Sequence, residues 1–151
     1  AERSSFMSAS SVCWVGSMMS SSRFRILHDG ARYNRLEKLR ALARWPEAMK
    51  YMRVCWEGVQ RDRNCCRCQK CVSNMLYLRI LGQRLPECFP WDISDREIVR
   101  LRCHDQAMIH SMERLVQAAK REKVSGSWVR ALRVSTLLNR VRLGMSWHRP
   151  A

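Results

Sequence analysis

Long apolar runs are missing from this 151-residue chain. The longest, such as Val12–Val15, cover only a few residues, whereas a membrane-spanning helix needs ~20. The N-terminal residues also lack the charged start and the apolar stretch of a secretory signal peptide. We therefore expect no membrane span, no membrane partner and a cytoplasmic location.

Recognisable arrangements of catalytic residues are missing as well. The chain has only 6 glycines, and they stand singly, so no glycine-rich loop can surround a phosphate with backbone N–H groups. Neither a Ser/His/Asp order nor a pair of carboxylates stands out. His28 with Asp29 could form an acid–base pair, and the alternative is a simple turn after a strand. The sequence assigns no catalytic residue.

Acidic residues are scarce relative to basic ones. The 13 Asp and Glu residues face 28 Lys and Arg residues, which gives a net charge of +15. Such an excess favours an anionic partner such as nucleic acid, although an arginine-rich solvent-exposed surface explains it equally well. Because the charge is spread along the chain, we expect weak binding of nucleic acid at low salt without sequence preference.

The apolar pattern predicts a mainly helical fold with two or three short strands. The strand-like pieces are Val12–Val15, Arg23–His28 and Met52–Trp56, the first two within a serine-rich segment. Helices are expected to start near Asn34, Pro46, Cys71, Ser94 and Ser127, and the one from Ser94 to be broken near Cys103–Asp105. The last helix should turn Trp128, Leu132, Ser135, Leu138 and Val141 inward.

Cysteine, in contrast, is abundant: the chain has 8, and they include a cluster between residues 65 and 71. Two-residue gaps allow a turn to present successive sulfurs to one ion, and four thiolates can complete a tetrahedron around Zn²⁺. The predicted ligands of a structural zinc are Cys55, Cys65, Cys68 and Cys71. Arg61, Arg63, Arg67 and Lys70 would offset the negative charge of such a site.

Other interpretations of the cluster stay open. An iron–sulfur cluster is one, although the Cys-Pro pair of a ferredoxin run does not follow Cys71. A redox dithiol or plain buried thiols are others. Cys66 could replace Cys65 as a ligand, but only Cys65 keeps the even two-residue spacing. The isolated Cys13, Cys88 and Cys103 are expected to be small core residues.

A series of short motifs runs from His28 to Gly82. They are His-Asp-Gly at 28–30, Arg-Leu-Glu-Lys at 35–38, Met-Arg-Val-Cys-Trp at 52–56, Asn-Cys-Cys-Arg-Cys-Gln-Lys-Cys-Val at 64–72 and Met-Leu at 75–76. The series resembles the C-terminal part of PP-loop ATP pyrophosphatase-like proteins related to 7-cyano-7-deazaguanine synthase. The likeness covers roughly a third of the chain, and Cys66 stands where the family pattern has glycine.

The resemblance implies an α/β PP-loop protein of the adenine nucleotide alpha hydrolase-like class that is missing its nucleotide-binding half. The full enzyme would adenylate a carboxylate or similar oxygen with ATP and then form an amide or nitrile. This chain has no SGGxDS loop, the ATP-binding signature of the family. We therefore expect a zinc-binding C-terminal region that is inactive alone, with an N-terminal PP-loop domain as its partner and as the site of ATP binding.

Three segments follow from this interpretation. Residues 1–33 form the serine-rich segment with remnant strands, residues 34–90 the helical zinc-binding region, and residues 91–151 a basic helical region. The alternative function is a basic, zinc-ordered module that binds nucleic acid. Its candidate surface is the last helix, with Arg130, Arg133 and Arg140 on one face and Trp128 and Trp147 nearby to stack on bases.

Overall fold

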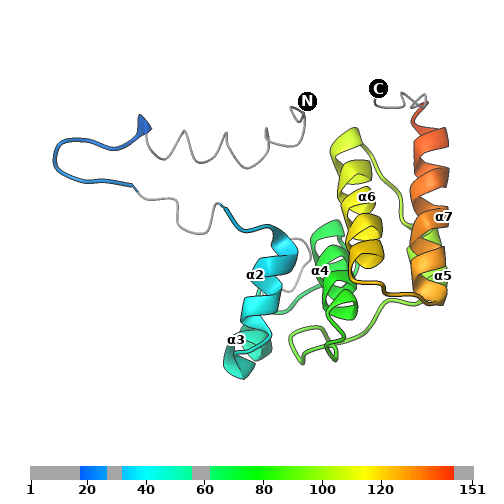
Figure 1. Cartoon of the computed structure of the whole chain (residues 1–151), viewed down its shortest axis with the longest axis horizontal. Coiled ribbons are helices and arrows are strands. Elements are labelled where there is room, and N and C mark those ends of the chain that lie inside the picture. Colours follow the sequence, from blue (N-terminus) through cyan, green and yellow to red (C-terminus); the bar gives the residue numbers. More distant parts are fainter. Residues whose placement is uncertain (1–17, 27–31, 56–61, 145–151) are drawn as a thin grey trace. The chain divides into compact units, whose positions relative to one another are not determined.

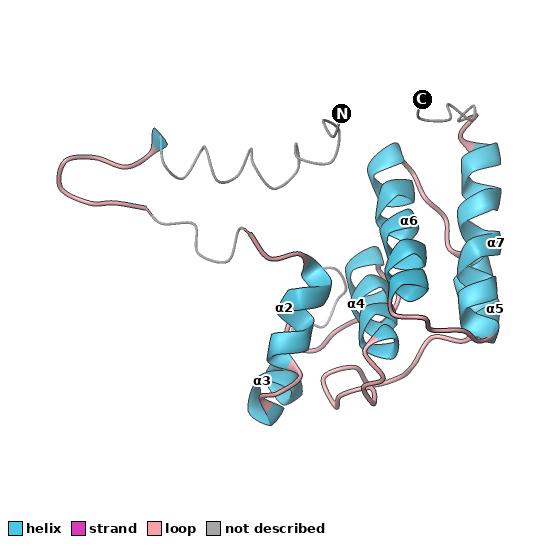
Figure 2. Ribbon diagram, viewed as in Figure 1, coloured by secondary structure: helices cyan, strands magenta, loops and turns pink. Residues whose placement is uncertain are grey.

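The computed structural model describes residues 18–26, 32–55 and 62–144. Within these ranges it contains helices and loops and no strand (Figure 2). The chain divides into two compact units, Ala1–Lys38 and Leu39–Ala151, and the boundary falls inside helix α2 (Arg35–Leu42). No helix in the described part of the chain is long and apolar enough to cross a membrane.

The strand-like pieces expected from the sequence do not form strands where they can be seen. Val12–Val15 and the end of Arg23–His28 lie outside the described residues, and residues 23–26 form a loop. Residues 52–55 follow the short helix α3 (Pro46–Tyr51) as neither helix nor strand, and Met52 has extended backbone angles. The strand expected at 52–56 is therefore not confirmed in its described part, residues 52–55.

Helix starts agree with the capping residues in the sequence. The Asn34 side chain accepts a hydrogen bond from the Glu37 N–H at 3.0 Å, and the Glu37 carboxylate accepts one from the Asn34 N–H at 2.7 Å. Ser94 and Glu97 form the same reciprocal pair before α5 (Asp95–Arg100). The predicted break then follows, and Asp105 caps α6 (Gln106–Arg121) by accepting from the Met108 N–H at 2.7 Å.

Helix α4 (Gln69–Ile80) lies at the centre of the second unit. Every residue from Cys71 to Leu78 is buried, so α4 is enclosed on all sides instead of on the single apolar stripe that its sequence suggests. Figure 1 shows α4 beside α6, with α7 (Ser127–Arg142) on the other side of α6 and next to α5. Helices from residues 34–90 and from residues 91–151, two segments that the sequence pattern treated separately, thus share one core.

Helix α7 is rotated relative to its predicted orientation. Leu132 and Ser135 are buried as expected, but Leu138 and Val141 are 54% and 72% exposed. Asn139 takes the inward position instead: its side chain accepts from the Cys103 N–H at 2.9 Å. It also donates to the carbonyls of Leu101 at 2.8 Å and Ser135 at 2.9 Å. A polar residue occupies the core because it satisfies backbone groups in the loop between α5 and α6.

Candidate metal centre

Four cysteine side chains converge at the N-terminal end of α4. Cys55 ends the extended piece, Cys65 and Cys68 lie on the turn before α4, and Cys71 lies in the first turn of that helix. Their sulfur atoms are all within 4.8 Å of one another. The structure thus brings together the four residues that the spacing indicated, as a group that could hold a metal ion.

The sulfur–sulfur distances are close to those of a tetrahedral site. The Cys65 and Cys71 sulfurs are 3.9 Å apart, and the Cys55 and Cys68 sulfurs are 3.5 Å apart. A regular tetrahedron with metal–sulfur bonds of ~2.3 Å has edges of about 3.8 Å. The two opposite edges therefore bracket the ideal length, and the remaining pairs, all within 4.8 Å, would need to close by ~1 Å at most around a single ion.

The turn that carries Cys65 and Cys68 depends on an unusual backbone angle. Cys66 has φ of 55°, in the left-handed region, which curls the chain so that the Cys68 N–H donates to the Cys65 sulfur at 3.3 Å. Backbone N–H groups in such a turn form a concave site that suits an anion such as a thiolate. Glycine is the residue with the least cost at positive φ, so a cysteine at this position adopts a conformation that few residues other than glycine take readily.

Cys66 itself is not part of the cluster. Its side chain is buried, and its thiol donates to the Asn64 carbonyl at a sulfur–oxygen distance of 3.7 Å. Burial raises the pKa of the Cys66 thiol, which keeps it protonated. The structure therefore separates Cys66 from the group of four and favours Cys65 at the position where the sequence left a choice.

The thiols of the cluster differ in acidity. Burial raises the pKa of Cys65, but hydrogen bonds from the N–H groups of Arg67 and Cys68 and from neighbouring thiols outweigh it and lower that pKa to about 7. Burial is also the largest cause that raises the pKa of Cys68, to about 11, and it raises the pKa of Cys71 strongly. A metal ion would displace protons from both of the latter thiols.

Asn64 positions the cluster, a role that the spacing of the cysteines does not indicate. The residue is fully buried. Its side-chain oxygen accepts from the Val54 N–H at 3.0 Å, and its amide nitrogen donates to the carbonyls of Met52 and Cys88, both at 2.9 Å. The side chain thus replaces a neighbouring strand along residues 52–54 and fixes Cys55 relative to the turn. Its place directly before Cys65 was the only signal available.

The other candidate residues are not gathered at the cluster. Cys103 is buried as expected, and Cys88 is half-buried. The remaining candidates lie outside the described residues: Cys13, His28, Asp29, Arg61 and Trp147.

The basic face expected on α7 is partly engaged in contacts. Arg130 and Arg133 are exposed, but Arg140 forms an ion pair with Glu113 at 2.5 Å. Trp128 is half-buried, with the Arg79 guanidinium 5.9 Å from its ring centre. Two of the residues proposed to contact nucleic acid thus already have protein partners.

The chemistry open to the cluster follows from its donors. Four protein thiolates fill a tetrahedral coordination sphere and leave no position for water or substrate, which is typical of a structural metal site. Such a site would join the extended piece, the turn and the start of α4. Comparisons of the chain with models of protein families, with curated proteins and with solved structures found no match.

Proposed function

We propose that Cys55, Cys65, Cys68 and Cys71 bind one structural zinc ion. We further propose that the chain serves as the zinc-binding C-terminal region of a PP-loop ATP-dependent enzyme of the adenylating, amide- or nitrile-forming kind. The observation that carries the proposal is the convergence of the four sulfurs within 4.8 Å. The enzyme class is supported by the motif resemblance, whose most specific part is this same cysteine segment.

Zinc suits the cluster better than the alternatives. An iron–sulfur cluster holds its cysteines on different irons, so the sulfurs of cysteines on different irons lie farther apart than the edge of a one-ion tetrahedron, whereas all four sulfurs here lie within 4.8 Å of one another. A disulfide has a sulfur–sulfur bond of ~2.05 Å, well below the closest pair here, Cys55 and Cys68 at 3.5 Å. Softer thiolate ligands in a tetrahedral arrangement favour zinc among the common divalent ions.

An exposed apolar stripe on α7 supports the assignment to a larger enzyme. Val134, Leu137, Leu138 and Val141 recur at helical spacing and are 47–72% exposed. Contiguous apolar surface of this kind is typical of sites that pack against another domain or chain. The N-terminal PP-loop domain that the resemblance implies is the proposed occupant of this face.

Metal analysis tests the first part of the proposal. Freshly purified, reduced chain should contain about one zinc per molecule, because four thiolates complete one tetrahedral ion. Cys68→Ser should lower the zinc content, whereas the neighbouring Cys66→Gly, outside the group of four, should leave it unchanged. Iron with sulfide, or no metal at all in the reduced protein, would contradict the proposal.

The coding DNA tests the second part. We expect the reading frame upstream of Ala1 to encode a PP-loop domain with an SGGxDS segment. The 151-residue chain alone should not bind ATP in calorimetry, because a phosphate-binding loop is missing from its sequence. A stop codon directly upstream, or micromolar binding of ATP by the chain alone, would refute the assignment to such an enzyme.

The second candidate function, binding of nucleic acid, is favoured by the net charge of +15. It requires a sequence or structure preference that survives about 150 mM salt, where non-specific binding is weak. It also requires charge reversal at Arg130, Arg133 and Arg140 to weaken binding more than charge reversal at Arg23, Arg32 and Arg44. We expect both triple variants to behave alike, because the charge is spread along the chain.

A further inference from the structure

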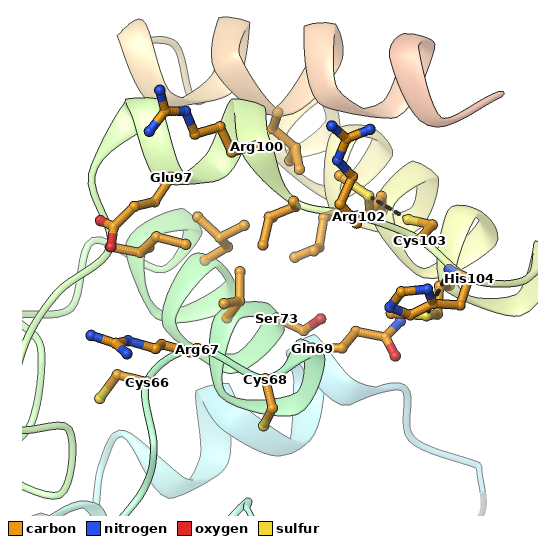
Figure 3. A pocket seen from close by; sticks show the side chains of 18 residues that line it. Cys66, Arg67, Cys68, Gln69, Ser73, Glu97, Arg100, Arg102, Cys103 and His104 are labelled. Carbon is orange, nitrogen blue, oxygen red and sulfur yellow. Dashed lines mark hydrogen bonds between the residues drawn. The ribbon is translucent and has the colours of Figure 1, made fainter. Parts of the chain in front are cut away.

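A cavity of about 550 Å³ opens beside the cysteine cluster, between α4, α5, α6 and the loop that joins α5 to α6 (Figure 3). Its size lies in the range of small-molecule sites. Aliphatic side chains form a large part of its wall, and no Phe, Tyr or Trp side chain lines it. The aliphatic lining residues are chiefly Val72, Leu76, Leu101, Met112, Leu115 and Leu132.

The rim of the cavity is basic. Arg67, Arg100 and Arg102 line it together with His104, and Glu97 is the single acidic residue among the lining side chains. The Glu97 carboxylate is occupied by its helix cap, where it accepts from the Ser94 N–H at 2.8 Å and from the Ser94 hydroxyl at 2.6 Å. The rim of the cavity therefore carries a net positive charge.

Two of the three arginines have no protein partner within the described part of the chain. The Arg67 guanidinium lies 5.9 Å from the Trp91 ring centre. Arg100 and Arg102 are exposed, and neither guanidinium makes a hydrogen bond, an ion pair or a ring contact with the residues at 18–26, 32–55 and 62–144. Figure 3 shows both guanidinium groups at the edge of the cavity, apart from each other and turned outward, so they would turn toward an anion bound at its mouth.

We propose that this cavity binds an aliphatic molecule that ends in an anionic head group, either a carboxylate or a phosphate. The aliphatic part of the ligand lies along the aliphatic wall of the cavity, and its anionic head group pairs with Arg100 and Arg102. This goes beyond the proposed structural zinc and does not depend on the enzyme assignment.

The lining chemistry favours an aliphatic body over a flat ring. Flexible side chains such as Met108 and Met112 adapt to a chain of variable shape, whereas stacking of a ring would call for an aromatic partner. The lining also contains Ser73, a buried residue labelled in Figure 3. A nucleic acid backbone would meet the arginines but would leave the apolar wall uncovered.

The test uses the whole zinc-loaded chain and three ligands of equal chain length: octanoate, octyl phosphate and 1-octanol. Calorimetry or an NMR titration should show saturable binding of one anion per chain. The preferred anion should bind about tenfold more tightly than octanol, because two partly exposed charge contacts together contribute about 1.4 kcal/mol. The comparison of octanoate with octyl phosphate then distinguishes a carboxylate from a phosphate ligand.

Matched variants locate the binding. The double variant Arg100→Ala/Arg102→Ala should bind the preferred anion about tenfold more weakly and octanol unchanged. The control Arg84→Ala/Arg121→Ala removes two exposed arginines that do not line the cavity and should change neither affinity. Met108→Trp, at a half-buried lining position, should block both ligands while circular dichroism shows an intact fold.

Three outcomes would overturn the proposal. One is the absence of saturable binding at millimolar ligand, and another is equal affinity for octanol and both anions. The third is an equal loss of anion binding in the cavity double variant and in the control double variant, which would show attraction to the net charge only. If Met108→Trp does not fold, the two arginine pairs still decide the outcome.

Discussion

The replacement Asn64→Ala removes the side chain that joins three separate backbone segments around the cysteine cluster. The wild-type amide is fully buried and makes hydrogen bonds to Met52, Val54 and Cys88 at 2.9–3.0 Å. Alanine cannot replace any of these bonds. In the variant, two carbonyls and one N–H near the cluster therefore lose their partner.

The expected cost follows from these bonds. A hydrogen bond contributes a net ~0.5–1.5 kcal/mol, and leaving a buried partner unsatisfied costs more, about 1–3 kcal/mol. The affected groups are only partly buried, so water can reach some of them in the variant. We expect the free energy of unfolding to fall by about 3 kcal/mol. Cys55 also loses its fixed position, so zinc affinity should fall by tenfold or more, the size reported for residues that orient metal ligands.

Asn139 offers a matched control. It is also buried, and its side chain also bonds to one N–H and two carbonyls, but it acts between α7 and the loop after α5. Asn139→Ala should therefore lower the free energy of unfolding by a similar amount and leave zinc affinity near that of the wild type. Urea unfolding gives the first quantity, and competition with a chelator under native conditions gives the second.

The comparison of the two variants can refute the reasoning. If Asn64→Ala binds zinc as tightly as the wild type, then Asn64 does not position Cys55. If Asn139→Ala weakens zinc binding as much as Asn64→Ala does, the effect follows from lost stability and not from the local bonds.

Three further predictions concern the cysteines. Cys66→Gly should leave zinc affinity unchanged and the free energy of unfolding within about 1 kcal/mol, because relief of the positive φ offsets the lost burial; loss of zinc from this variant would show that Cys66 is a ligand. Because the pKa values of Cys68 and Cys71 are raised, zinc must displace at least these two protons, so its affinity should fall about a hundredfold or more per unit of decreasing pH near neutrality; a tenfold or smaller change in a chelator titration would contradict this. Burial raises the pKa of Cys88 to about 11, above that of an unfolded thiol, so its contribution to stability is complete below about pH 8.5 and is lost as the pH rises toward 11. In urea unfolding, Cys88→Ala should therefore flatten the alkaline part of the stability profile, and an unchanged profile would assign that loss to other groups.

The sequence predicted those features that depend on near neighbours in the chain. The spacing of the cysteines identified the four thiols that converge, because two-residue gaps and the start of a helix fix most of the geometry locally. The Ser94 and Glu97 pair and the break before Asp105 were also visible, since capping depends on residues only three positions apart.

Features that depend on contacts between distant residues were not visible. Asn64 reaches Cys88, and Asn139 reaches Leu101, through side-chain bonds to backbone groups 24 and 38 positions away. Nothing in the local pattern separates such a buried asparagine from one in a surface loop. The predicted orientation of α7 was wrong for the same reason. The prediction assigned an apolar stripe of this helix to the core, although the position of Asn139 decides which face turns inward.

The two buried asparagines hold loop segments that have no strand beside them within the described residues. Each satisfies one N–H and one carbonyl of such a segment and a second carbonyl elsewhere, and each thereby fixes part of a candidate site. Asn64 holds the extended piece that presents Cys55, and Asn139 holds the loop that presents Leu101 and Arg102 to the cavity. Cys68 belongs to the cluster and also lines the cavity, so the proposed zinc and the proposed ligand share one structural element at the start of α4. Any effect of zinc on ligand affinity must then be matched by an equal effect of the ligand on zinc affinity, because coupling between two binding sites is reciprocal.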